Sequence, residues 1–276
     1  MRQLPPLSST DKAGICLLEY ADTSSGKTAS AVTGIPRILY INKEEKDARL
    51  VHSALNPKYY EFMDHVEFDG FYDEMEFLNE LILQYNNGER PYETIFHDGL
   101  TFSMVKYKQT TEDQRFAMNE KLKKDAERVG LSEIIIDRTM KEWRDWDVIA
   151  GLMAREANLL NKLSKFGLLV VSTAISTEYP KWNQSVKIAP SLIGKEFPKI
   201  IHGLFDTIGY IVTPFHINHD GQVIKPKISF VNYGDDFTNT YMCRASGLLI
   251  EMERRFGPQT LNLAKIAAVI RGEIKF

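Results

Sequence analysis

The chain has 276 residues, of which 43% are hydrophobic and 26% charged, a composition typical of a globular protein. Its net charge of −3 excludes binding of nucleic acid through overall basicity, so any such binding needs a local basic patch. Two cysteines, Cys16 and Cys243, are too few for a disulfide framework, and no apolar run reaches membrane-spanning length. We therefore expect a cytoplasmic protein with free thiols and no membrane contact.

Short apolar runs along the chain predict strands that are covered on both faces. They lie at 14–20, 37–41, 94–97, 167–172, 208–212 and 227–232. Helical periodicity separates them, with one helix over 71–85 that stops at an Asn-Asn-Gly turn and a second that ends near residue 167. This alternation predicts an α/β fold with a mostly parallel sheet layered by helices, in which residues 14–276 form one core after an arm at 1–13.

The turn after the first predicted strand ends like a phosphate-binding loop. Gly26 lets the backbone approach an anion closely, Lys27 neutralises phosphate charge, and Thr28 is a ligand for Mg²⁺. A strand before the turn and a helix beginning within 28–33 favour a working site over a chance surface turn.

Two residues of this loop depart from the usual pattern. Ala21 and Ser24 stand where such loops commonly carry glycine, and alanine is tolerated there if its φ stays negative. We still expect the whole loop to hold ATP. Its residues are Ala21, Asp22, Thr23, Ser24, Ser25, Gly26, Lys27, Thr28 and Ala29.

Polar residues at the ends of other predicted strands complete the expected site, because ligands collect at the carboxyl ends of parallel strands. Asp98 is expected to orient Mg²⁺. Without the phosphate-loop candidate upstream, Asp98 and the glycine after it would be interpreted as an ordinary turn at the end of a strand. Glu44 or Glu45 would polarise the attacking water, and the other would be a solvated acid. Thr173 would sense the γ-phosphate or be an ordinary strand exit, and His97 is expected to be packed rather than catalytic.

The segment 176–199 is a candidate contact for single-stranded DNA, because it combines aromatic rings that can stack on bases with lysines that can follow phosphates. The candidate residues are Tyr179, Lys181, Trp182, Lys187 and Lys195. Three prolines and a glycine favour a mobile loop over a packed element. A capped loop with its tryptophan in the core is the alternative. Residues 61–93, with ten acidic residues against one basic residue, would instead repel a phosphate backbone.

The order of these parts resembles that of the phage RecA-like ATPases, a group that includes single-strand-annealing recombination proteins with a recombinase core. The matching stretches span about residues 12–272. They are "LLEYADTSSGKTASA", "PRILYINKEEK", "TIFHDGLT", "EWRDWDVIAGLMAREANLLNKLSKFGLLVVSTA", "APSLIGKEFPKIIHGLFDTIGYI", "YMCRASG" and "LNLAKIAAVIRG".

The resemblance implies a role for each matching position. Glu44 would activate water, Asp98 would orient the metal ion, and Thr173 would act as the strand-end sensor. The segment 176–195 would touch single-stranded DNA, and Arg244 would reach the nucleotide of a neighbouring subunit in a ring or filament. The departures from the family pattern are Ile175, where relatives often carry histidine, and Ser246, where a second basic residue is usual.

The sequence therefore predicts a RecA-like ATPase that uses ATP and Mg²⁺ with slow intrinsic turnover. Its output would be ATP-modulated binding of single-stranded DNA by a homo-oligomer, in phage recombination, annealing or replication. Two alternatives stay open. One is a small-molecule or nucleoside kinase with the same loop, although the arginines of its middle region are interspersed with acids. The other is a nucleotide-binding interaction protein that does not hydrolyse, suggested by Ala21 and Ser24.

Overall fold

The fold is taken from a computed structural model of the chain. The residues that it describes are 12–68, 70–128, 143–180, 186–192, 197–217, 223–232 and 239–274.

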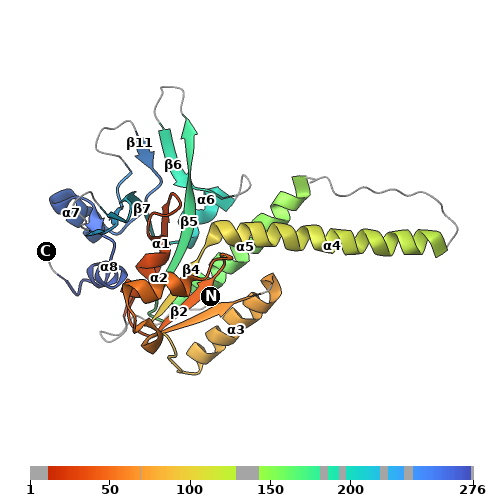
Figure 1. The fold of residues 1–276 in the computed structure, drawn as a ribbon, viewed down its shortest axis with the longest axis horizontal. Coiled ribbons are helices and arrows are strands. Elements are labelled where there is room, and N and C mark those ends of the chain that lie inside the picture. The colour runs from red at the N-terminus through yellow and green to blue at the C-terminus, as the bar shows by residue number, and fades with distance from the viewer. Residues whose placement is uncertain are drawn as a thin grey trace, which may run out of the picture.

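A mostly parallel sheet forms the centre of the structure (Figure 1). Its main path has the order β12-β10-β7-β1-β5-β4-β2-β3, with β6 beside β5 and β11 beside β6. Neighbours from β7 to β3 are parallel, whereas β10 and β12 are antiparallel. The bounds are β1 (Ile15–Ala21), β2 (Ile38–Asn42), β3 (Met63–Glu67), β4 (Thr94–Asp98), β5 (Leu169–Pro180), β6 (Val186–Pro190), β7 (Thr207–Thr213), β10 (Lys227–Ser229), β11 (Asn239–Tyr241) and β12 (Gln259–Thr260). A separate two-stranded pair consists of β8 (His216–Ile217) and β9 (Val223–Ile224).

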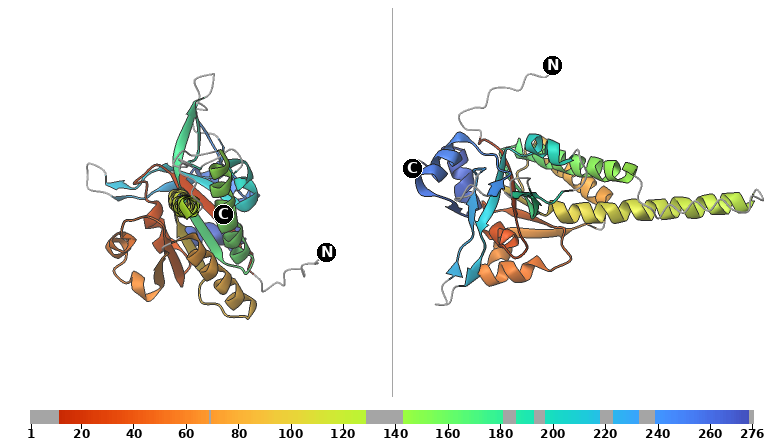
Figure 2. Two further views of the ribbon diagram at one scale, coloured as in Figure 1. Left: turned by 90° about the vertical axis from the view of Figure 1, so that its right-hand side faces the viewer. Right: turned by 90° about the horizontal axis from the view of Figure 1, so that it is seen from above.

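Helices cover both faces of this sheet. Their bounds are α1 (Lys27–Ser30), α2 (Ala48–Leu55), α3 (Phe71–Asn86), α4 (Leu100–Arg128), α5 (Trp143–Ser164), α6 (Phe197–Leu204), α7 (Gly247–Phe256) and α8 (Leu263–Ile270). Apolar residues of α3, α4, α5 and α6 pack on one face, and those of α2, α7 and α8 pack on the other. The far half of α4 extends well beyond the sheet, as Figures 1 and 2 show. The predicted α/β fold with a mostly parallel sheet is confirmed.

The predicted strands form where apolar runs allow burial on both sides. Every residue of β1, β2 and β4 is buried. The last predicted strand, 227–232, is shorter than expected and ends at Ser229. The reason is local: the N–H of Phe230 donates to the Glu253 carboxylate at 2.6 Å. The predicted helix over 71–85 is confirmed as α3, and the helix predicted to end near residue 167 is α5.

The expectation of a mobile loop after the fourth predicted strand is wrong for the part that the structure describes. Ser176–Pro180 of β5 and Val186–Pro190 form an antiparallel ladder, which projects from the sheet in Figure 1. Pro180 and Pro190 are the last residues of their strands, where a missing N–H interrupts no interior ladder bond. The ladder is also anchored in the core, because Ile188 and Ala189 are buried.

Across the described ranges, no helix combines the length and the apolar character needed to cross a membrane.

Candidate functional site: a loop, a carboxylate and a pocket

The phosphate-loop candidate lies between β1 and α1. Ala21 is the last, buried residue of β1, so it does not need the backbone freedom of glycine. Ser24 and Gly26 both have left-handed φ angles, of 61° and 97°. Gly26 is also packed closely, because an added Cβ would lie 3.2 Å from the Cβ of Phe215. The left-handed φ of Ser24 is one that glycine adopts more easily, and it costs serine about 1 kcal/mol of strain.

The helix after this loop is shorter than the sequence predicts. It starts at Lys27 and ends at Ser30, and a 3₁₀ turn over Ala31–Thr33 follows before Gly34. Because so few peptide dipoles are aligned, the helix adds little to anion binding, which must come mainly from the loop amides and Lys27.

Lys27 folds back onto its own loop. Its buried Nζ donates to the carbonyls of Ala21 at 3.0 Å and Asp22 at 2.6 Å, and lies 3.4 Å from the Ser25 hydroxyl. Burial lowers the pKa of the Lys27 amine, against the opposing pull of the Asp98 and Glu19 carboxylates. The ammonium is thus held at the loop by neutral carbonyls, which an anionic ligand can replace.

The Asp98 carboxylate accepts hydrogen bonds from hydroxyl groups of three other segments. Asp98, at the end of β4, accepts from Thr28 at 2.7 Å, Tyr40 at 2.5 Å and Thr173 at 2.5 Å. Gly99 allows the close approach of β5, because a Cβ there would lie 2.1 Å from Thr173 Oγ1. The structure therefore brings together Thr28 of the predicted loop with Asp98 and Thr173, which were predicted at two separate strand ends.

Of the two candidate glutamates, Glu44 is the one that faces this region. Glu44 lines the pocket and is half-buried, whereas Glu45 is exposed and does not line it. The backbone N–H of Glu44 donates to the Asn42 side chain at 3.2 Å. Burial, together with repulsion from Asp98, raises the pKa of Glu44 above its ordinary value. A carboxylate with a raised pKa is better suited to accept a proton near neutral pH.

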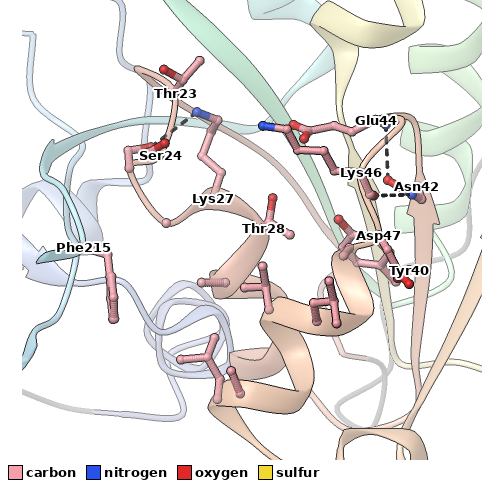
Figure 3. Close-up of a pocket in the computed structure, with 18 of the residues that line it drawn as sticks. Thr23, Ser24, Lys27, Thr28, Tyr40, Asn42, Glu44, Lys46, Asp47 and Phe215 are labelled. Atoms are coloured by element: carbon pink, nitrogen blue, oxygen red, sulfur yellow. Dashed lines mark hydrogen bonds between the residues drawn. The ribbon is translucent and has the colours of Figure 1, made fainter.

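The loop, Tyr40 and Glu44 line one pocket of 610 Å³, shown in Figure 3, whereas Asp98 and Thr173 are buried and do not line it. Its polar wall contains the loop, Lys27, Thr28 and Glu44. Its other wall is apolar and comes largely from α2. That wall consists of Ala48, Leu50, Val51, Ala54 and Leu55, with Phe102, Ile175 and Phe215 at other sides. Leu50 is 73% exposed, so a large apolar side chain lies at the surface beside a charged loop.

A buried acid beneath the loop was not anticipated from the sequence. Glu19 lies inside β1 and accepts a hydrogen bond from Ser30 at 2.7 Å, while its other oxygen has no partner among the described residues. Burial raises its pKa to about 8, against the hydrogen bond from Ser30. Its only sequence signal was an acid inside an otherwise apolar strand.

The remaining predicted residues lie outside the pocket. Arg244 is exposed and pairs through its backbone with Ile208 of β7. Ser246, a noted departure, caps α7 by accepting from the N–H of Leu249 at 3.4 Å. Tyr179 and Lys187 are exposed and sit opposite each other on the β5–β6 ladder. The other DNA candidates, Lys181, Trp182 and Lys195, lie outside the described residues.

In comparisons with known proteins, no family model matches this sequence, and no curated protein is similar enough to count as a relative. The chemistry of the site therefore has to be argued from its own residues.

Proposed function

We propose that this chain is a RecA-like ATPase that binds a nucleoside triphosphate with Mg²⁺ in the loop pocket and hydrolyses it. The observation that carries the proposal is the convergence on Asp98 of hydroxyls from the loop helix, β2 and β5, beside Lys27. The Lys27 ammonium, the Thr28 hydroxyl and the Glu44 carboxylate line one pocket, and the buried Asp98 is joined to it by the hydrogen bond from Thr28.

The residues present fit a magnesium ion. Thr28 offers a half-buried hydroxyl and Asp98 a carboxylate, both hard oxygen ligands of the kind that Mg²⁺ takes. When bound, the ion would neutralise charge on the β- and γ-phosphates. Lys27 would exchange its bonds to the carbonyls of Ala21 and Asp22 for bonds to phosphate oxygens.

The reaction that fits these groups is attack of water on the γ-phosphorus. A new phosphorus–oxygen bond forms as the bond to the β–γ bridging oxygen breaks, and ADP leaves. Glu44 accepts the proton that the water loses. The apolar wall of α2 suits the nucleobase, since it continues directly from the polar wall in a pocket of ligand size.

Contacts between the loop and the β5–β6 ladder support the proposed link to single-stranded DNA. Asp22 of the loop accepts a hydrogen bond from Ser176 at the base of the ladder. Thr173, which contacts Asp98, lies on the same strand as Tyr179. A change at the phosphates can therefore reach Tyr179 along β5, and Lys187 lies opposite Tyr179 on β6. An aromatic ring beside a lysine is a suitable contact for a stacked base and its phosphate.

Turnover assays of the wild type and Lys27→Ala, with and without single-stranded DNA, test this proposal. We expect DNA to stimulate hydrolysis, and Lys27→Ala to lower kcat/KM by roughly 100-fold or more, because the variant removes the charge that stabilises the transferring phosphoryl group. Lys265→Ala, at an exposed lysine of α8, is the matched control and should leave turnover unchanged.

Two other results would support the rival functions instead. Phosphoryl transfer to a small acceptor, with little hydrolysis, would indicate a kinase. Nucleotide binding without any turnover, in the presence or absence of DNA, would indicate an interaction protein. The absence of nucleotide binding by the wild type would refute all three.

A further inference from the structure

A second group of charged residues lies buried on the opposite face of the sheet from the pocket. Lys43 follows β2, His97 lies in β4, and Glu74 and Glu156 reach in from α3 and α5. The side chain of Lys43 is 2% exposed and the two carboxylates are fully buried. Figure 1 shows α3 and α5 packed beside these strands.

The contacts within this buried cluster are dense. Lys43 Nζ pairs closely with Glu74 Oε2 and lies 3.3 Å from Glu156 Oε1. His97 Nε2 lies 2.9 Å from the same Glu156 oxygen. Two hydroxyls of α4 complete the group, with Ser103 donating to Glu156 at 3.0 Å and Tyr107 to Glu74 at 3.1 Å.

The cluster also has the composition of a metal site, but its cation is already supplied. Ligand atoms of Glu74, His97 and Glu156 lie within 4.8 Å of one another. The ammonium of Lys43, however, contacts both carboxylates. Although burial acts in the opposite direction, Lys43 and His97 hold the pKa of Glu156 below its usual range. The ammonium of Lys43 therefore occupies the position between Glu74 and Glu156 that a metal ion would take in a metalloprotein.

The position of the cluster ties it to the pocket through the backbone. Lys43 immediately precedes Glu44, and His97 immediately precedes Asp98. His97 and Asp98 are successive residues of β4, so their side chains point to opposite faces of the sheet. Lys43 and Glu44 follow the last residue of β2, with Lys43 buried in the cluster and Glu44 in the pocket wall. The N–H of Lys43 also donates to the Asp98 carbonyl at 2.7 Å, which closes β2 against β4 one residue beyond the strand.

We propose that Lys43 is a positioning residue for Glu44. Its ammonium is held by two buried carboxylates and its amide by Asp98, so the backbone at this point has one arrangement. Glu44 then leaves the end of β2 in a fixed direction, toward the Thr28 and Asp98 side of the pocket. The inference rests on the proposed function, in which Glu44 accepts the proton from water.

The kinetic test replaces Lys43 together with Glu74, so that the net charge of the cluster is unchanged and Glu156 keeps its contact with His97. Lys43→Met with Glu74→Gln is expected to lower kcat by roughly 10- to 100-fold while KM stays within about threefold, because a misplaced base slows only the chemical step. Glu74→Gln alone keeps the Lys43–Glu156 contact and is expected to retain kcat within about threefold. The single variant Lys43→Arg should lose less kcat than Lys43→Met/Glu74→Gln, since it keeps a cation at the same place.

Amide exchange of the nucleotide-free proteins provides a readout that does not depend on ATPase activity. In Lys43→Met/Glu74→Gln, the backbone amide of residue 43 should exchange about 100-fold faster than in the wild type, while the amides of β1 stay protected. Loss of kcat with unchanged exchange, a proportional loss throughout the sheet, or full retention of kcat would each overturn the proposal. A metal ion bound stoichiometrically by Glu74, His97 and Glu156 in the purified wild type would do so as well. A wild type without turnover but with fast exchange only in the double variant would refute the proposed function and leave the backbone anchor intact.

Discussion

Glu19 and Glu156 are buried on opposite faces of the sheet, and the pKa of one is raised while that of the other is lowered. On the pocket face, Glu19 has one hydrogen-bond donor and an oxygen without a partner among the described residues, and burial raises its pKa to about 8. On the far face, Lys43 and His97 overcome burial and lower the pKa of Glu156. Glu156 thus has two basic side chains in direct contact, whereas Glu19 has only a hydroxyl donor. Glu74, beside Glu156, is intermediate: burial and repulsion from Glu156 raise its pKa to about 7 although Lys43 contacts it. The difference between Glu19 and Glu156 is expected where binding and structural support are divided between the two sides of one sheet.

The largest effect on stability is expected from the far face. Glu156→Gln removes one of the two carboxylates that contact Lys43 and the one closest to His97, and should lower the free energy of unfolding by about 3 kcal/mol at pH 7, because a buried ion pair loses one partner. The folded pKa of Glu156 lies below its ordinary value of 4.5, so its stabilising contribution is present above that pH and is lost as the pH falls. Denaturant titration at pH 7 and pH 4 measures both effects.

Glu80→Gln, at an exposed glutamate of α3, is the matched control, with an expected change within about 0.5 kcal/mol. If Glu156→Gln were as mild as this control, the far face would not depend on its charges, and the contrast with the pocket face would disappear.

On the pocket face, the pH dependence of stability is expected to have the opposite sign. The folded pKa of Glu19 is raised, so the folded state holds a proton that the unfolded state has lost between pH 4.5 and about 8, and wild-type stability falls as the pH rises through that range. Glu19→Gln removes this penalty and should add about 1–3 kcal/mol more stability at pH 8.5 than at pH 5.5. Unfolding curves at the two pH values test the difference, and an equal effect at both would show that Glu19 is not the group that titrates.

The smallest effect is expected from strain in the loop. Ser24→Gly should stabilise the protein by about 0.5–1 kcal/mol, since glycine accepts the left-handed φ of 61° without a clash of its Cβ. Ser53→Gly, at an exposed position of α2, is a control of the opposite sign and should destabilise by about 0.5–1 kcal/mol. Thermal unfolding of both variants provides the comparison, and destabilisation by Ser24→Gly would mean that this serine makes a contact worth more than its strain.

The sequence predicts the pocket face better than the far face, for reasons of distance along the chain. The loop from Ala21 to Ala29 is one continuous segment, and Asp98 and Thr173 directly follow apolar runs that end at the same edge of a parallel sheet. Strand order is enough to bring such residues together.

The far face depends on tertiary packing that no local pattern contains. Lys43 contacts Glu74 and Glu156, which lie 31 and 113 residues further along the chain, on faces of α3 and α5 that are otherwise apolar. No pattern in the sequence distinguishes these two acids from solvent-exposed ones. The β5–β6 ladder was missed for a related reason, because its prolines indicate a loop unless they are known to fall at the ends of paired strands.

The most direct measurement of the central claim is a crystal structure of the protein with Mg²⁺ and a non-hydrolysable ATP analogue. We predict that the analogue binds in the pocket of Figure 3, with its base against α2 and Mg²⁺ near Thr28 and Asp98. Lys27 Nζ should move from the carbonyls of Ala21 and Asp22 to phosphate oxygens. A pocket that stays empty at saturating analogue, with Lys27 still bonded to its own loop, would contradict this prediction.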